Sequence, residues 1–108
     1  MQITNIEVVQ NDATYDLNFT LQDYAGNAVN LSGASISLKV QKENSNAIKF
    51  TGSMSIVSAA AGTCKYTVAA GDFDEAGKFA AEIQVTIGSQ VLTWTGIIIK
   101  VLPELPKS

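Results

Sequence analysis

Apolar and polar residues alternate with a period of two along most of this chain, and that pattern constrains the fold more than any other feature. The alternation is clearest over residues 15–21, 36–40, 64–68 and 79–87. A period of two fits a β-strand with one buried and one solvated face, because successive side chains of a strand point to opposite faces. The chain is therefore expected to form half-buried strands that pack as layers around one core.

The choice of apolar residues supports this expectation. Ile, Val and Thr together number 28 of the 108 residues, against 7 Leu. β-Branched side chains are stiff in a helix and pack well on a pleated surface. We predict a single antiparallel β-sandwich of about seven to eight strands. Its predicted core consists of Leu17, Phe19, Leu21, Ile36, Leu38, Val40, Tyr66, Val68, Phe79, Ile83, Val85 and Trp94.

The last two strands form a predicted hairpin around Gly88-Ser89, because a glycine in the first position indicates a type II′ turn. A two-residue loop sets the cross-strand register. That register pairs Ile87 with Gln90, Val85 with Leu92, Ile83 with Trp94, Ala81 with Gly96, and Phe79 with Ile98. Ala81 then faces Gly96, and these two small residues leave room for the indole of Trp94 in the core.

The same register predicts an unusually apolar outer face on the last strand. This face is too apolar for the solvated surface of a monomer. Either another segment of the chain covers it, for example the N-terminal strand, or a partner subunit does. The candidate interface residues are Ala80, Ile97, Ile99 and Val101.

Chain length indicates one domain, since 108 residues leave little room for a second core. Both prolines, Pro103 and Pro106, follow the last predicted strand. We therefore expect one sandwich domain over residues 1–102 and an exit tail over residues 103–108.

Few side chains here can carry reaction chemistry. The sequence contains no His, no Arg and one Cys. These absences exclude His-based acid–base catalysis, His-ligated zinc and an arginine clamp for phosphate. We predict that the protein is not an enzyme, and that it has no catalytic residue, no metal and no cofactor.

Two local features have ordinary structural interpretations. Cys64 alternates with Tyr66 and Val68, which is typical of a small buried residue rather than a reactive thiol. The acidic residues 72, 74 and 75 lie close together, but the twelve-residue calcium-loop pattern is absent. A solvated corner is the favoured interpretation of this cluster.

Charge and hydropathy exclude several partners. The net charge is -3, and the seven lysines are scattered singly, whereas a nucleic-acid-binding protein normally carries a basic stripe. The N-terminus lacks a basic segment followed by an apolar run, so it does not predict a signal peptide. The longest apolar run is Ile97-Ile98-Ile99, far below the roughly 20 residues of a membrane span. We expect neither nucleic acid nor membrane as a partner.

Residues 15–34 resemble a known family. Asp23 to Ala34 follows a D-x-x-G-x-x-V-x-L-(S/T)-G-A connection, preceded by an alternating strand. Residues 62–68 then match G-x-x-x-Y-x-V, and residues 77–83 match G-x-(F/Y)-x-A-E-(I/V) after a corner. A terminal I-x-V strand follows at residues 99–101. The chain from about residue 12 to residue 102 thus resembles the N-terminal domain of phage baseplate upper proteins and related tail, fibre and neck proteins.

The resemblance implies an immunoglobulin-like sandwich with a structural, non-enzymatic role in a virion or prophage tail. It implies docking to other copies of itself, as a homo-oligomer, or to neighbouring tail proteins, after synthesis in the bacterial cytoplasm. The alternative function is a carbohydrate-binding module for host cell-surface glycan. In that alternative Tyr24, an aromatic residue at a predicted turn, is the candidate glycan contact.

Overall fold

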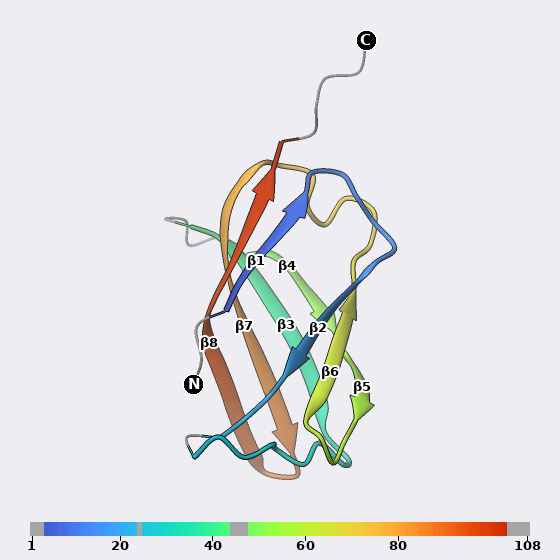
Figure 1. Cartoon of the computed structure of the whole chain (residues 1–108), viewed down its shortest axis with the longest axis vertical. Helices are drawn as coiled ribbons and strands as arrows, with labels where there is room; N and C mark the ends of the chain where they lie inside the picture. Colours follow the sequence, from blue (N-terminus) through green and yellow to red (C-terminus); the bar gives the residue numbers. More distant parts are fainter. Residues whose placement is uncertain (1–3, 24, 44–47, 104–108) are drawn as a thin grey trace.

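A computed structural model describes residues 4–23, 25–43 and 48–103 of the chain. These residues form two packed layers of strands (Figure 1). The strands are β1 (Thr4–Val9), β2 (Asp16–Thr20), β3 (Ser35–Lys42), β4 (Ile48–Ser53), β5 (Ser55–Ser58), β6 (Thr63–Thr67), β7 (Gly77–Ile87) and β8 (Gln90–Leu102). The described part of the chain contains no helix, and therefore none that could cross a bilayer. The predicted all-β sandwich is confirmed.

Strand order identifies the type of sandwich. The larger sheet has the order β1-β8-β7-β3-β4, and the smaller has the order β2-β6-β5. Strands β2, β5 and β6 thus face strands β3, β7 and β8, which is the arrangement of immunoglobulin-like sandwiches. Neighbouring strands pair antiparallel, except that β1 runs parallel to β8 along its outer edge. The N-terminal strand therefore extends the sheet beside β8 and does not cover its face.

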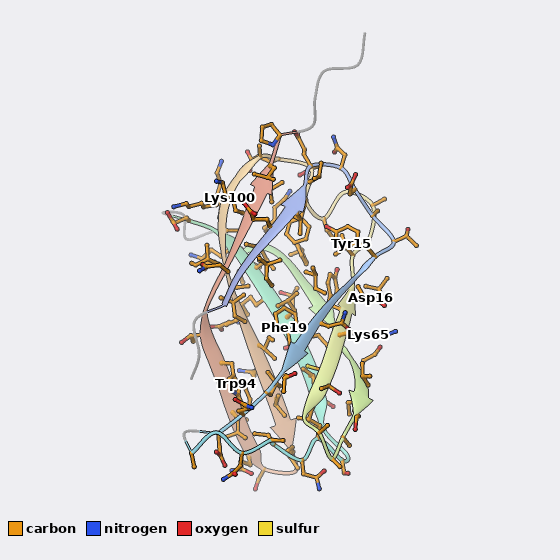
Figure 2. The ribbon with its side chains drawn as sticks, in the orientation of Figure 1. Tyr15, Asp16, Phe19, Lys65, Trp94 and Lys100 are labelled. Atoms are coloured by element: carbon orange, nitrogen blue, oxygen red, sulfur yellow. The ribbon has the colours of Figure 1, made fainter. Side chains whose placement is uncertain are left out.

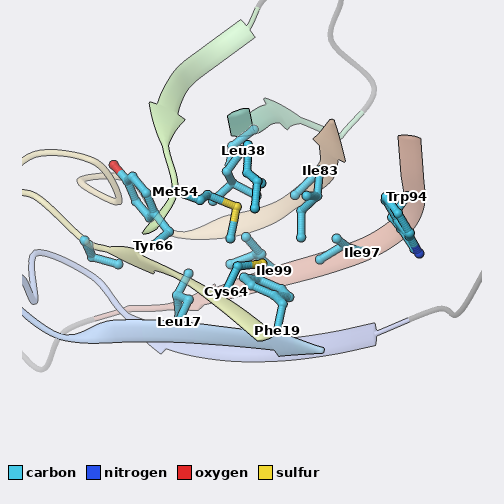
Figure 3. Close-up of a cluster of buried hydrophobic side chains, with 14 of the residues drawn as sticks. Leu17, Phe19, Leu38, Met54, Cys64, Tyr66, Ile83, Trp94, Ile97 and Ile99 are labelled. Atoms are coloured by element: carbon cyan, nitrogen blue, oxygen red, sulfur yellow. The ribbon is translucent and has the colours of Figure 1, made fainter. Parts of the chain in front are cut away.

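The core lies between the two sheets (Figure 3). Every residue that the alternation assigned to the core is buried. Several further residues join them, namely Val8, Leu31, Met54, Cys64, Phe73, Ala81, Ile97, Ile99 and Val101. Cys64 is fully buried, so its interpretation as a small core residue is confirmed. Phe73 lies in the β6–β7 corner and packs edge-on against Phe79, with ring centroids 6.4 Å apart.

The chain changes sheets between β4 and β5, where Met54 enters the core. Gly52 makes this crossing possible, because the ring of Tyr66 lies directly against its backbone. A β-carbon built on Gly52 would clash with Cε1 of Tyr66. Tyr66 also stacks on Phe50, at a centroid distance of 5.7 Å. Position 52 thus requires a residue without a side chain for the two sheets to close.

The predicted hairpin register is correct near the turn and wrong beyond Trp94. Ile87 pairs with Gln90 and Ile83 pairs with Trp94, as the two-residue loop requires. A β-bulge then inserts one extra residue into β8, so that Ala81 pairs with Ile97 rather than with Gly96. Gly96 has a φ of 79°, a left-handed conformation that glycine adopts without a steric penalty. Because side chains alternate with a period of two, the single extra residue reverses the faces of the rest of β8.

Candidate docking surface

The bulge removes most of the predicted interface from the surface. Ile97, Ile99 and Val101 are 4%, 0% and 2% exposed, and they point into the core instead of outward. The apolar outer face that the regular register predicted is therefore wrong for these three residues. Ala80 alone of the four candidates is exposed, and its partner on β8 is Ile98.

The outer face of the larger sheet still carries an apolar row, which consists of Ile48, Ala80 and Ile98. The register places these residues side by side across β4, β3, β7 and β8, with Gln41 between Ile48 and Ala80. Ile48 is 52% exposed, and Ile98 is partly exposed. The row is short, and it crosses the open sheet face from the edge strand β4 to β8.

Charged side chains border the apolar row on both sides. On one side the Lys39 ammonium lies 3.8 Å from a carboxylate oxygen of Glu82. On the other side Lys78 pairs with Lys100 across β7 and β8, and Glu7 of β1 pairs with Lys100 in turn. Charges of both signs thus surround a small apolar centre, an arrangement typical of the core and rim of a protein interface.

Two open hollows lie on this face. One has a volume of about 410 Å³, and Ile48, Ala80, Thr95 and Gly96 contribute to its walls. The other has a volume of about 370 Å³ and includes Ile98 among its lining residues. Because Ala80 and Ile98 are cross-strand neighbours, the two hollows adjoin along the apolar row. The small side chain of Ala80 and the lack of one at Gly96 leave the first hollow open.

The acidic residues of the β6–β7 corner do not converge on a common point. Asp74 forms an ion pair with Lys49 at 2.5 Å, and Glu75 forms one with Lys42 at 3.1 Å. The hydrogen bond from Lys49 and its charge hold the pKa of Asp74 below the usual value. Asp72 instead accepts one hydrogen bond from the Ala69 backbone amide and one from the Tyr66 hydroxyl. Each acid has its own partner, and the described residues contain no group of acids, Cys or His that could hold a metal ion.

Asp72 fastens the corner to the smaller sheet. Its Oδ2 accepts a hydrogen bond from the Tyr66 hydroxyl at 2.5 Å and another from the Ala69 amide at 2.8 Å. Burial, together with the bond to Asp72, raises the pKa of Tyr66. Nearby, burial also raises the pKa of Tyr15. The bonds of Asp72 to Tyr66 and Ala69 hold the corner in place.

Cys64 and Trp94 are both withdrawn from the surface. Burial raises the pKa of Cys64 to about 11, which keeps the thiol protonated at neutral pH. Trp94 is buried, and its Nε1 donates a hydrogen bond to the Gln22 carbonyl at 2.9 Å. The indole therefore offers no face to a sugar ring. Tyr24, the candidate glycan contact, lies outside the described residues.

Comparison with known proteins gives one finding. Residues 1–106 match the family of BppU N-terminal domains, the N-terminal domains of baseplate upper proteins. No curated protein matches the chain.

Proposed function

Because the chain belongs to the BppU N-terminal domain family of phage baseplates, we propose that it is a non-enzymatic assembly domain that binds a neighbouring tail or baseplate protein through the outer face of its larger sheet. A structural protein of the virion, associated with other phage tail proteins, is what this family implies. In this proposal the chain is made in the bacterial cytoplasm. It enters the virion without binding nucleic acid, membrane or cofactor.

The apolar row carries the proposal. Ile48, Ala80 and Ile98 would be desolvated at the centre of the contact, and the charged residues on either side would form its rim. Rim charges of both signs favour a partner with a complementary pattern, and they make the association rate sensitive to salt. The adjoining hollows, which charged as well as apolar residues line, would accept side chains of the partner.

The state of the reactive groups supports a non-enzymatic role. The acids of the corner are bound to lysines, to Tyr66 or to backbone amides. The sole thiol is fully buried. Contact area, rather than reaction chemistry, is what the outer face offers.

The test is binding of the chain to each purified tail and baseplate protein of the same virion, measured by biolayer interferometry. Ala80→Arg places a long charged side chain in the apolar row and should weaken binding at least about tenfold, the effect of 1.4 kcal/mol. Thr20→Arg, on an exposed position of the smaller sheet, is the matched control and should bind like the unmodified chain. Equal binding by both variants would mean that the contact lies elsewhere on the domain. Failure of the unmodified chain to bind any of the proteins would refute the assembly role.

Glycan binding is the alternative, and it rests on Tyr24 alone. Saturable binding on a glycan array, lost on Tyr24→Ala, would favour a carbohydrate-binding module. Trp94 is buried, so it cannot provide a second aromatic contact for such a site.

A further inference from the structure

Few contacts attach β1 to the rest of the fold. Among the described strands it pairs with β8 alone, and its other edge is free (Figure 1). Its inward face contributes two apolar side chains, the buried Val8 and the partly buried Ile6. Its outward residues Asn5, Glu7 and Val9 are exposed. A segment with little buried apolar surface at a sheet edge opens locally at a lower free energy than the centre of the domain.

The connection from β1 to β2, residues 10–15, carries backbone strain. Asn11 and Thr14 have φ values of 69° and 63°, and in the described chain they are the residues other than glycine with a positive φ. Asn tolerates this left-handed conformation, whereas a β-branched residue adopts it rarely. For Thr14 the conformation is about fivefold to thirtyfold less favourable than an ordinary one. Straightening of the connection would release this strain.

A turn in this connection folds the chain back after β1. The Asp12 amide closes the turn by donating to the Val9 carbonyl at 3.2 Å, and the Asn11 amide donates to the Phe73 carbonyl at 2.9 Å. Asn11 and Asp12 are exposed, so water can replace both bonds when the turn opens. Six residues of extended chain span up to about 20 Å, which is enough to carry β1 to the sheet edge of a copy beside it.

We infer that two copies of this chain exchange β1, so that β1 of each copy pairs with β8 of the other. The vacated edge of β8 determines the occupant, because it presents Ile99 and Val101, beside which Ile6 and Val8 lie in a parallel register. β1 of a second copy supplies the same side chains in the same register. Exchange therefore regains every contact between β1 and β8 and releases the strain in both connections. Reciprocal exchange is also closed, so association stops at the dimer.

The strength of the dimer follows from two quantities, because exchange replaces contacts within one chain by the same contacts between two chains. The first is the effective concentration of β1 at its own β8, which is about 1 mM for a segment on a short connection. The second is the strain at Thr14, which is released in both copies and favours the dimer by about 25-fold to 900-fold. The Kd of the exchanged dimer should therefore be about 1–40 μM.

Disulfide trapping tests the exchange directly. Glu7 of β1 pairs with Lys100 of β8, and both are exposed, at a strand spacing of about 4.8 Å that permits a disulfide. Glu7→Cys and Lys100→Cys are prepared separately, mixed at about 1 mM, equilibrated and oxidised. The disulfide-linked dimer of the two variants should be at least about fivefold more abundant than in the control mixture of Glu7→Cys with Thr20→Cys, which carries an exposed thiol on the smaller sheet. The native Cys64 is fully buried and does not compete.

Sedimentation equilibrium links the dimer to the strain. The mass of the unmodified chain should rise from 11.4 kDa toward twice that value with concentration. Thr14→Gly removes the strain, because glycine adopts the left-handed conformation without a steric penalty. Ala13→Gly is the matched control, since it adds a glycine to the same connection and leaves Thr14 in place. The Kd of Thr14→Gly should be at least about tenfold higher than that of Ala13→Gly.

Three results would overturn the inference. The first is a single copy at every concentration up to about 2 mM. The second is a linked dimer of Glu7→Cys with Lys100→Cys that is no more abundant than in the control mixture, which would mean that any dimer forms by surface contact. The third is an equal Kd for the two glycine variants. Melting temperatures confirm that each variant is folded. The assembly proposal is judged separately, by Ala80→Arg and the purified tail proteins.

Discussion

The run Ile97-Ile98-Ile99 provides a direct test of the bulge in β8, because three identical residues are placed in two different environments. Ile97 and Ile99 are 4% and 0% exposed, whereas Ile98 points to the outer face and is partly exposed. Substitution of each by Ala removes the same atoms. The effect on the free energy of unfolding should therefore depend on burial alone.

The expected magnitudes are well separated. Truncating a buried Ile to Ala costs about 2–5 kcal/mol, since apolar burial is lost and a cavity remains. At Ile98 the same change should cost about 1 kcal/mol or less. A domain of this size typically has a total stability of about 5–15 kcal/mol, so the larger effect remains measurable. It should lower Tm by at least about 10 °C for Ile99→Ala, against a few degrees for Ile98→Ala.

Urea unfolding followed by the fluorescence of Trp94 measures these differences, because this single Trp is buried in the same strand. The loss in the free energy of unfolding should be much larger for Ile99→Ala and Ile97→Ala than for Ile98→Ala. A regular hairpin without the bulge would give the opposite order, with Ile98 the most sensitive. That outcome, or equal effects at the three positions, would refute the placement of β8 described above.

Three further predictions concern the core and the corner. Gly52→Ala should destabilise the protein by about 1–3 kcal/mol in urea unfolding, because the new methyl group meets the Tyr66 ring; an effect below about 0.5 kcal/mol would contradict that contact. Cys64 should react with iodoacetamide at pH 8 far more slowly in the folded chain than in 8 M urea, since burial raises its pKa to about 11; equal rates would show that the thiol is accessible. Asp74→Asn should remove the stabilisation that the ion pair with Lys49 provides. That stabilisation is present above the unfolded-state pKa near 3.8 and is lost as the pH falls through the lower folded-state pKa, so the difference in Tm from the unmodified chain should disappear in acid. A difference in Tm that persists in acid would mean that the ion pair is not its source.

Local alternation was sufficient to predict the strands and most of the core. A strand needs no distant information to show which of its faces is apolar, and all the predicted core residues are buried. The turn at Gly88-Ser89 is equally local, and the register is correct for as long as the hairpin remains regular. Phe73 was missed because it lies in a corner without alternation, where only its packing against Phe50 and Phe79 shows its role.

The candidate surfaces depended on contacts between distant residues. The acids of the corner lie close together in the chain, but their partners Lys42 and Lys49 are on other strands. Likewise, Ile48, Ala80 and Ile98 of the apolar row are remote in sequence, and strand pairing brings them together.

What the sequence determined by itself was therefore the all-β class, the strands, the core and the hairpin turn, since each follows from side-chain chemistry over a few residues. What only the tertiary structure decided was which face of β8 is buried beyond Trp94. One extra residue at Gly96 reverses every later side chain, and such a bulge is stable only because the opposite sheet offers Ile97 and Ile99 an apolar core. The alternation within β8 is by itself compatible with burial of either face of the strand.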